Sequence, residues 1–347
     1  MVENKQVIFV KVPTTYPVAG EHLQVHTATF DLEQPLTEGQ LMLKLLALSV
    51  DPYMRGRMRD PSVKSYAPAF ELGKPMTGGT VSVVLKSKNP NFKEGDLVFG
   101  LGVFEEYSLL SADQAKNFIV NNQPKETGLP LTNYLGVLGM PGMTAYVGLF
   151  KYGQPKAGET LYVSAASGAV GQLVGQMGKA LGMRVVGSAG TDEKVAYLKE
   201  IGFDGAFNYK TSDIDVKLGE LCPDGIDVYF ENVGGKMLEL VLNHANSYAR
   251  IVACGMISQY NREQPEGVHN LMQIVTKRLR FEGFIVGDPV NADMREPFMK
   301  ETTKSLLEKK IQYKETVAYG IEKTPEALVD VLQGRNFGKQ VVKVADL

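Results

Sequence analysis

The sequence contains no tryptophan and only two cysteines among 347 residues. Cys222 and Cys254 lack C-x-x-C spacing, which argues against a disulfide framework and a cysteine-rich zinc site. No basic run occurs and the formal net charge is -2, so neither nucleic acid nor an anionic membrane is an expected partner. No apolar run approaches the length of a membrane span, and the N-terminus lacks the layout of a signal peptide. We therefore expect a cytoplasmic protein.

Histidine is also scarce, and the four histidines do not predict a metal site. His22, His26, His244 and His269 have no acidic or cysteine partner at ligand spacing. His22 and His26 are four residues apart, but their segment does not have a helical pattern, so we expect surface histidines. No Ser-His-Asp order accompanies a nucleophile elbow. The sequence therefore predicts a site without metal.

The length exceeds that of a usual single domain, and the pattern changes along the chain. Residues 1–130 contain many short strand-like runs separated by Gly, Pro and Asn, which is typical of a small β-barrel. Residues 131–311 alternate strands and helices, as in a doubly wound Rossmann domain. Residues 312–347 again indicate strand, helix and strand, and we expect them to complete the first domain. The predicted fold class is α/β, a β-barrel domain plus a doubly wound Rossmann domain.

The most informative stretch predicts a βαβ unit. A buried strand at 160–164 leads into a loop of small residues at 165–171, a helical pattern that stops at Gly182, and a second strand at 183–187. Gly168 and Gly171 keep two positions of the G-x-G-x-x-G pattern, and Ala166 replaces the first glycine. Such a turn aims backbone N–H groups at a pyrophosphate. The sequence favours a dinucleotide site over an ordinary turn of small residues.

The end of the second strand indicates which dinucleotide binds. A carboxylate that binds the adenosine ribose is expected about 20 residues beyond the glycine loop, but the chain has Ser188, Ala189 and Gly190 there. Lys194 follows in the first turn of a helix. We predict that Lys194 binds the 2′-phosphate of NADPH. The alternative is an exposed lysine offset by the acidic residues at 192 and 193.

Polar residues also follow two later strands, at the sheet edge where ligands bind. Asn232 is expected either to bind ribose or nicotinamide or to cap a helix. Ser258 and Tyr260 face the same crevice if the topology is right, whereas Cys254 is interpreted as a packed thiol. A redox enzyme without metal needs hydrogen-bond donors to polarise its substrate, and Tyr260 and Tyr53 are candidates. The alternative for each tyrosine is a packed ring with a satisfied hydroxyl.

Several motifs, taken in order along nearly the whole chain, resemble one family. They are Asp51-Pro52-Tyr53-Met54-Arg55-Gly56-Arg57-Met58, Gly139 to Tyr146, Ala165 to Gly171, Asp192 to Leu198, Phe207 to Lys210, Cys254 to Asn261 and Asn336-Phe337-Gly338-Lys339. This pattern is similar to that of the zinc-independent medium-chain reductases called leukotriene B4 12-hydroxydehydrogenase/prostaglandin reductase and the plant NADPH-dependent alkenal double bond reductases. Zinc-dependent relatives carry a catalytic Cys and a Gly-His-Glu motif, and neither is found here.

The resemblance implies a GroES-like barrel domain, a Rossmann domain, NADPH as cofactor and a homodimer. It places Pro52, Tyr53, Gly168, Ala169, Val170 and Gly171 against the cofactor, with Gly190, Lys194 and Tyr209 at the 2′-phosphate. It places Asn232, Cys254, Ser258, Tyr260, Phe284, Ile285, Val286 and Asn336 near the ribose and nicotinamide. The substrate-facing loops, roughly 58–70 and 264–270, resemble the family least.

The expected reaction is hydride delivery from NADPH to the β-carbon of an α,β-unsaturated aldehyde or ketone. Tyr260, with Tyr53 or a ribose hydroxyl, would donate a hydrogen bond to the enolate-like oxygen. Two alternatives stay open. One is a quinone reductase or a secondary-alcohol dehydrogenase on the same scaffold, and the other is a non-catalytic NADPH-binding protein.

Overall fold

The computed structural model describes residues 1–347 and divides them into two compact units. Unit 1 comprises residues 1–136, 316–336 and 340–347, and unit 2 comprises residues 137–315 and 337–339. Both boundaries fall a few residues later than the change in composition. The short helix η1 (Leu131–Leu135) inserts Leu135 into a core cluster with Leu46 and Val81 of unit 1. The segment before Thr316 is instead bonded to unit 2, where the backbone N–H of Lys314 donates to Gln172.

Unit 1 is rich in β-structure and contains two sheets. One has the order β2-β1-β4, from β1 (Val2–Phe9), β2 (Leu23–Phe30) and β4 (Lys74–Pro75). The other has the order β15-β16-β3-β5-β6-β8, with β7 also paired to β3; it uses β3 (Leu41–Ser49), β5 (Thr77–Ser87), β6 (Leu97–Val103), β7 (Tyr107–Leu110), β8 (Phe118–Val120), β15 (Glu315–Tyr319) and β16 (Lys339–Lys343). Strand β5 includes Gly78 and Gly79, although glycine is usually depleted in strands.

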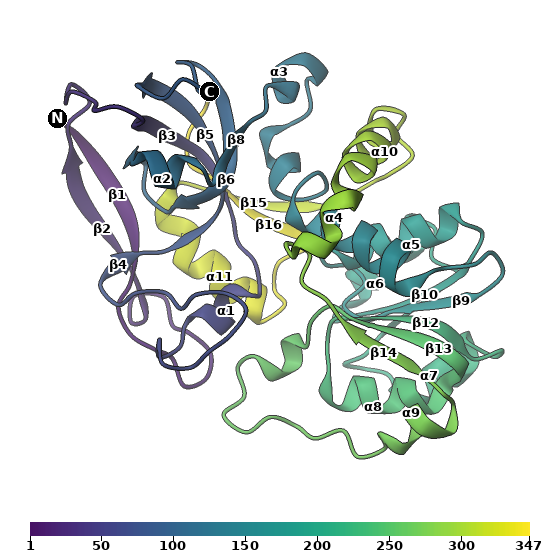
Figure 1. The fold of residues 1–347 in the computed structure, drawn as a ribbon. Helices are drawn as coiled ribbons and strands as arrows, with labels where there is room; N and C mark the ends of the chain where they lie inside the picture. The colour runs from purple at the N-terminus through teal and green to yellow at the C-terminus, as the bar shows by residue number, and fades with distance from the viewer. The chain divides into compact units, whose positions relative to one another are not determined.

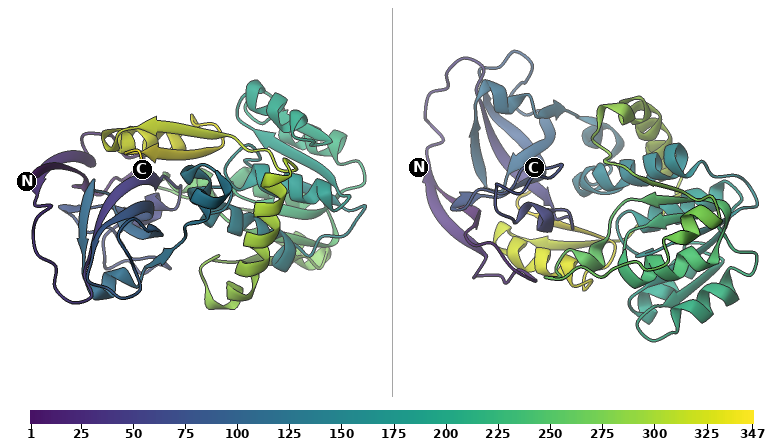
Figure 2. Two further views of the ribbon diagram at one scale, coloured as in Figure 1. Left: turned by 90° about the horizontal axis from the view of Figure 1, so that it is seen from above. Right: turned by 60° about the horizontal axis from the view of Figure 1, so that its bottom comes forward.

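The end of the chain returns to unit 1, as expected from its strand–helix–strand pattern. Strand β16 pairs with β3, and Figure 2 shows the C-terminal strands and helix (yellow) beside the N-terminal ones (purple and blue). Helix α11 (Thr324–Leu332) adds Leu328 and Val331 to a buried cluster that also holds Val7 and Leu48. The remaining short helices are α1 (Met54–Arg57), α2 (Ala112–Ala115), α3 (Gln123–Thr127) and η5 (Ile321–Lys323).

Unit 2 is built on a six-stranded sheet with the order β11-β10-β9-β12-β13-β14. Its strands are β9 (Thr160–Val163), β10 (Arg184–Ala189), β11 (Gly205–Asn208), β12 (Ile226–Glu231), β13 (Ala245–Ala253) and β14 (Arg280–Gly283), and every neighbouring pair is parallel. The strand order reverses between β9 and β12. In open parallel sheets, ligands bind at the carboxyl ends of the strands beside such a reversal.

Helices cover both faces of this sheet (Figure 1). Helices α5 (Gly171–Ala180) and α6 (Asp192–Glu200) lie on one face, and α7 (Ile214–Leu221), α8 (Gly235–His244) and α9 (Met272–Thr276) bury their apolar residues against the other. Helix α4 (Met140–Val147) continues into the π-helix η2 (Gly148–Gly153). The 3-10 helix η4 (Pro289–Met294) precedes helix α10 (Arg295–Leu307). None of the helices is both long and apolar enough to span a membrane.

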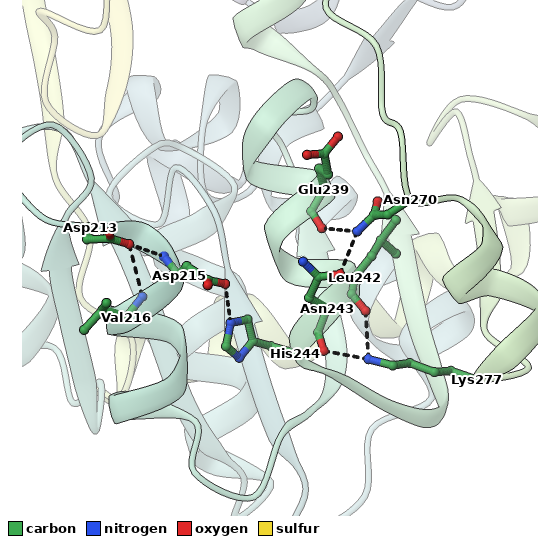
Figure 3. A network of polar contacts seen from close by, with 9 residues as sticks. All are labelled: Asp213, Asp215, Val216, Glu239, Leu242, Asn243, His244, Asn270 and Lys277. Atoms are coloured by element: carbon green, nitrogen blue, oxygen red, sulfur yellow. Dashed lines mark hydrogen bonds and ion pairs between the residues drawn. The ribbon is translucent and has the colours of Figure 1, made fainter.

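Side-chain hydrogen bonds connect the helices on the second face (Figure 3). His244, at the end of α8, contacts the Asp215 carboxylate of α7 through Nε2 at 2.8 Å. Lys277 Nζ donates to the carbonyl oxygens of Leu242 and Asn243 at 2.9 and 2.7 Å, so that it caps the C-terminal end of α8. These contacts lie on the far side of the sheet from α5 and α6.

Candidate functional site

The loop between β9 and α5 is a tight turn whose backbone leaves no room for side chains at one glycine. A Cβ on Gly171 would lie 2.6 Å from the carbonyl oxygen of Ala165 and 2.7 Å from the Cα of Ala166. Ala165 itself has a φ of 48°, in the left-handed region. The predicted loop Gly168, Ala169, Val170 and Gly171 therefore lies directly at the N-terminal end of α5, where backbone N–H groups can receive an anion.

The end of β10 leads into a cationic region. Thr191 caps α6, and its side chain accepts a hydrogen bond from the backbone N–H of Lys194. Lys194 is only 9% exposed, so the alternative of an exposed lysine is wrong. Burial, and then the charge of Lys210, lowers the pKa of Lys194. Gly190 lies beside this region, because a Cβ there would be 3.3 Å from both Tyr209 and Lys210.

The end of β12 is held by buried polar groups. Glu231 is fully buried and accepts hydrogen bonds from the backbone N–H groups of Val233 and Gly234. Burial raises the pKa of its carboxyl group in spite of these bonds. Asn232 donates through Nδ2 to the carbonyl oxygen of Ser164 at 2.8 Å and does not cap α8, so the capping alternative is wrong. The Asn232 side chain is instead fixed against the loop that follows β9.

The segment after β13 contributes Cys254, Ser258 and Tyr260. Burial, followed by the charge of Glu231, raises the pKa of the Cys254 thiol to about 12, so this thiol is protonated at neutral pH. The Ser258 hydroxyl donates to the carbonyl oxygen of Val233, which connects the segments after β12 and β13. The Tyr260 hydroxyl accepts a hydrogen bond from the backbone N–H of Met256 at 3.2 Å. A phenol that accepts such a bond is polarised toward donating its own proton.

The predicted contact segment 284–286 follows β14. The ring of Phe284 stacks on Tyr152 of η2, with ring centroids 4.9 Å apart. The carbonyl oxygen of Ile285 accepts a hydrogen bond from Asn291 Nδ2 at 3.0 Å, and Val286 is partly exposed. Local packing therefore fixes the segment immediately beyond the sheet edge.

In unit 1, Tyr53 directly precedes α1 and is bonded to a buried arginine. Its hydroxyl is hydrogen-bonded to Arg57, whose Nη1 donates to the carbonyl oxygen of Thr77 at 2.7 Å. The Arg57 guanidinium also lies 4.0 Å from the centroid of the Phe70 ring. Burial, and then the charge of Asp51, raises the pKa of Tyr53 to about 12. Tyr53 is therefore a neutral hydrogen-bonding phenol at physiological pH.

The structure brings most of the predicted residues together at one edge of the unit 2 sheet, after β9, β10, β11, β12, β13 and β14. Pro52, Tyr53 and Asn336 instead belong to unit 1. Prediction from sequence missed Lys210, Gln172 and Lys314, three residues of unit 2 close to this edge. Tyr197 is a further omission, and its hydroxyl donates to Gln172 Oε1 at 2.7 Å. Gln172 directly follows the glycine loop, but no spacing in the sequence connects Lys210, Lys314 or Tyr197 with it.

One expectation about the histidines is wrong. His22 is 7% exposed rather than on the surface, because its Nδ1 accepts a hydrogen bond from the backbone N–H of Val18 within the turn before β2. His26 lies on β2 and is exposed, as expected. No group of three or more His, Cys, Asp or Glu residues is arranged to hold a metal ion.

These features fit a phosphorylated dinucleotide. The tight turn at Gly171, where a Cβ would meet backbone atoms, suits the binding of a pyrophosphate at the start of α5. The lysines after β10 and β11, with Ala189 and Gly190 in place of a carboxylate, suit an additional phosphate on the adenosine ribose. A hydroxyl at Tyr260 can donate to an oxygen on which negative charge develops.

Comparisons with known proteins agree with this architecture. A family model described as "N-terminal domain of oxidoreductase" matches residues 5–118, and one described as "Zinc-binding dehydrogenase" matches residues 169–304. The chain is 49% identical to an NADP(+)-dependent 2-alkenal reductase of Nicotiana tabacum, covering 99% of this chain and 98% of that protein. It is 42% identical to prostaglandin reductase 1 of Mus musculus, covering 89% and 91%.

A solved structure agrees with the fold as well. The crystal structure of CurA from Vibrio vulnificus in complex with NADPH is 38% identical and has a TM-score of 0.90, covering 99% of this chain and 100% of that one. The two family models and this structural similarity together identify the architecture as a GroES-like domain plus a Rossmann domain. The chain belongs to the zinc-independent medium-chain dehydrogenase/reductase family, in the group that includes 2-alkenal reductase and prostaglandin reductase.

Proposed function

We propose that this protein is an NADPH-dependent reductase of the carbon–carbon double bond in α,β-unsaturated aldehydes and ketones. The observation that carries the proposal is 49% identity, over nearly the full length of both chains, to an NADP(+)-dependent 2-alkenal reductase. The cationic region around Lys194 supports NADPH rather than NADH, because β10 ends at Ala189 and is followed by Gly190, so that no carboxylate stands at the strand end to repel a 2′-phosphate.

Each predicted residue has a defined task in this proposal. The loop Gly168–Gly171 receives the pyrophosphate, and Gly190, Lys194 and Tyr209 receive the 2′-phosphate. The rest of the cofactor is contacted by the other predicted residues, namely Asn232, Cys254, Ser258, the segment 284–286, Pro52, Tyr53 and Asn336. The hydrogen bond from Asn232 to Ser164 supports its role, since it keeps the side chain at the sheet edge.

When bound, NADPH supplies the hydride for the β-carbon of the substrate. Negative charge then develops on the substrate carbonyl oxygen, and the Tyr260 hydroxyl donates a hydrogen bond to that oxygen. Acceptance of the Met256 N–H by the same hydroxyl strengthens it as a donor. Tyr53, a neutral phenol held by Arg57, is the second candidate donor. The α-carbon takes its proton from water or a tyrosine, which completes the saturated carbonyl product.

The test is NADPH oxidation with an enal, an enone, a quinone and a saturated ketone, each repeated with NADH. We expect turnover of the conjugated aldehyde and ketone only, with NADPH strongly preferred. Tyr260→Phe should lower kcat for the enone by about 100-fold or more, because loss of one donor to a developing oxyanion costs about 2.7–4 kcal/mol. NADPH affinity should stay close to that of the wild type.

Tyr248→Phe is the matched control, because Tyr248 is 66% exposed and lies on β13 away from the strand end. Unchanged enone turnover in Tyr260→Phe would exclude the role of this hydroxyl. Turnover of quinones alone would assign the protein to quinone reduction, and turnover of saturated ketones or alcohols to the alcohol dehydrogenase alternative. Tight NADPH binding without any turnover would favour a non-catalytic binding protein.

We also propose that the protein is a cytoplasmic homodimer. Strand β14 is the last strand of the sheet and has a neighbour on one side only, so its other edge has backbone groups available for pairing. Large apolar residues are exposed on and next to it, with Met272 at 69%, Val275 at 68% and Phe281 at 36%. A second copy related by a twofold axis would pair β14 with β14 and cover these residues. Both cysteines are free thiols, which supports a reducing compartment.

A further inference from the structure

The segment before β15 is tied to the helix that starts at the glycine loop. The backbone N–H of Lys314 donates to Gln172 Oε1 at 2.8 Å, and Gln172 Nε2 donates back to the carbonyl oxygen of Lys314 at 3.2 Å. The same carbonyl oxygen accepts the backbone N–H of Lys339 at 3.0 Å. Gly338 is required beside it, since a Cβ there would lie 1.9 Å from that oxygen. The backbone of Lys314 is therefore fixed next to the second residue of α5.

Two aromatic rings direct the Lys314 side chain. Its Nζ lies 4.8 Å from the centroid of the Tyr197 ring and 4.5 Å from that of Phe337. The two rings meet edge to face, with centroids 5.2 Å apart. The hydroxyl of Tyr197 donates to Gln172, so this ring is also held in place. The contacts of the Lys314 ammonium are thus aromatic faces, which orient a cation without neutralising it.

Lys194 contacts the same ring. Its Nζ lies 5.9 Å from the centroid of Phe337, so the two ammonium groups lie close to one aromatic side chain. Burial, and then the positive charge of Lys210, disfavours the charged form of Lys194, and the charge of Glu193 favours it. Cations gathered in this way favour the binding of an anion beside them.

We propose that Lys314 determines cofactor specificity together with Lys194, and that its ammonium binds the 2′-phosphate on the adenosine ribose of NADPH. The inference rests on the proposed use of NADPH and adds a residue to that site. It favours the 2′-phosphate over the pyrophosphate because Lys194, which shares the Phe337 ring with Lys314, follows the strand end where the ribose 2′ position is recognised. Two cations on one phosphate also suit its charge of nearly −2 at neutral pH.

The test is calorimetric titration of the full-length protein with adenosine 2′,5′-bisphosphate and with 5′-AMP, which differ only in the 2′-phosphate. Lys314→Met keeps an unbranched side chain over the two rings and removes the charge. We expect it to weaken the binding of the bisphosphate about tenfold, as for loss of one charge-assisted contact, and to leave the affinity for 5′-AMP within about twofold. The loss should shrink with added salt. Lys314→Arg should retain most of the affinity.

Lys300→Met is the matched control, because Lys300 is an exposed lysine on α10 of the same unit. Unchanged bisphosphate affinity in Lys314→Met, or equal losses for both ligands, would overturn the inference. Failure of Lys314→Arg to retain affinity would also overturn it, because the role would then be structural.

Lys194→Met separates this inference from the proposed function. If wild-type protein prefers the bisphosphate, and Lys194→Met abolishes that preference while Lys314→Met does not, the inference about Lys314 alone fails. If wild-type protein shows no preference for the bisphosphate, the proposed NADPH specificity fails with it.

Discussion

Replacement of Gly171 by alanine tests whether the glycine loop has the tight geometry that a pyrophosphate requires. The new Cβ would lie 2.6 Å from the carbonyl oxygen of Ala165, 2.7 Å from the Cα of Ala166 and 2.8 Å from its carbonyl oxygen. All three are backbone atoms, so no side chain can rotate away. Their turn cannot easily relax, because Ala165 already has a φ of 48° and the backbone N–H of Ala166 donates to Ser188 at 2.9 Å.

The expected magnitude follows from two opposing effects. Overpacking of a well-packed region costs about 1–3 kcal/mol, whereas alanine gains up to about 1 kcal/mol over glycine through helix propensity. We therefore expect Gly171→Ala to lower the free energy of unfolding by about 1–2 kcal/mol. Affinity for adenosine 2′,5′-bisphosphate should fall as well, because any relief moves the first turn of α5. Urea unfolding followed by circular dichroism measures the first effect and calorimetry the second.

Gly168→Ala is the matched control in the same loop. A Cβ on Gly168 would meet a single neighbour, the carbonyl oxygen of Ala165 at 3.2 Å, so a small shift would accommodate it. We expect a change of less than about 1 kcal/mol in the free energy of unfolding. The reasoning is refuted if Gly171→Ala is as stable as the wild type and binds the nucleotide equally well, or if the two variants lose the same stability.

Two further predictions concern charge and assembly. Burial and then the charge of Lys210 lower the pKa of Lys194, so bisphosphate binding should weaken as pH rises through a value below the ordinary lysine pKa. Lys210→Met should raise the pH at which this weakening occurs. Titrations at a series of pH values measure that pH, and an unchanged or lower value contradicts the prediction. Phe281→Glu should convert the proposed dimer to a monomer, because it places a charge at the edge strand β14. Sedimentation equilibrium measures the oligomeric state. A monomeric wild-type protein, or a variant that still dimerises, would disprove the interface.

Local sequence patterns were sufficient to predict most elements that position the site. The strand, loop and helix around Gly168 and Gly171 form as expected, and Lys194 lies in the first turn of a helix, α6, as predicted. These features depend on interactions between residues close in the chain, namely capping, turn chemistry and helical periodicity, which a single sequence contains. The same holds for the end of the second strand, where Ala189 and Gly190 stand in place of a carboxylate and indicate NADPH.

Contacts in the folded chain decide features that the residue type alone does not indicate. Strand β5 includes Gly78, where a Cβ would lie 2.7 Å from both Met54 and Phe104, so that packing between distant segments favours glycine in a strand. His22 is buried because a turn before β2 supplies a donor to its ring. The contact at Gly78 joins distant segments, whereas the bond to His22 is local and spans four residues, and each overrides the usual preference of the residue type.

Residues that are neighbours along the chain are enough to predict the βαβ unit and Lys194 in the helix after its second strand, and motifs in order along nearly the whole chain indicate the family. Only the tertiary structure placed Lys314 and Phe337 against Lys194 and Tyr197. It also showed that Lys194 is buried and that Asn232 is bonded to Ser164 instead of capping a helix. These facts depend on strand order and on the return of the C-terminal segment to α5, long-range contacts that leave no periodic pattern in the sequence.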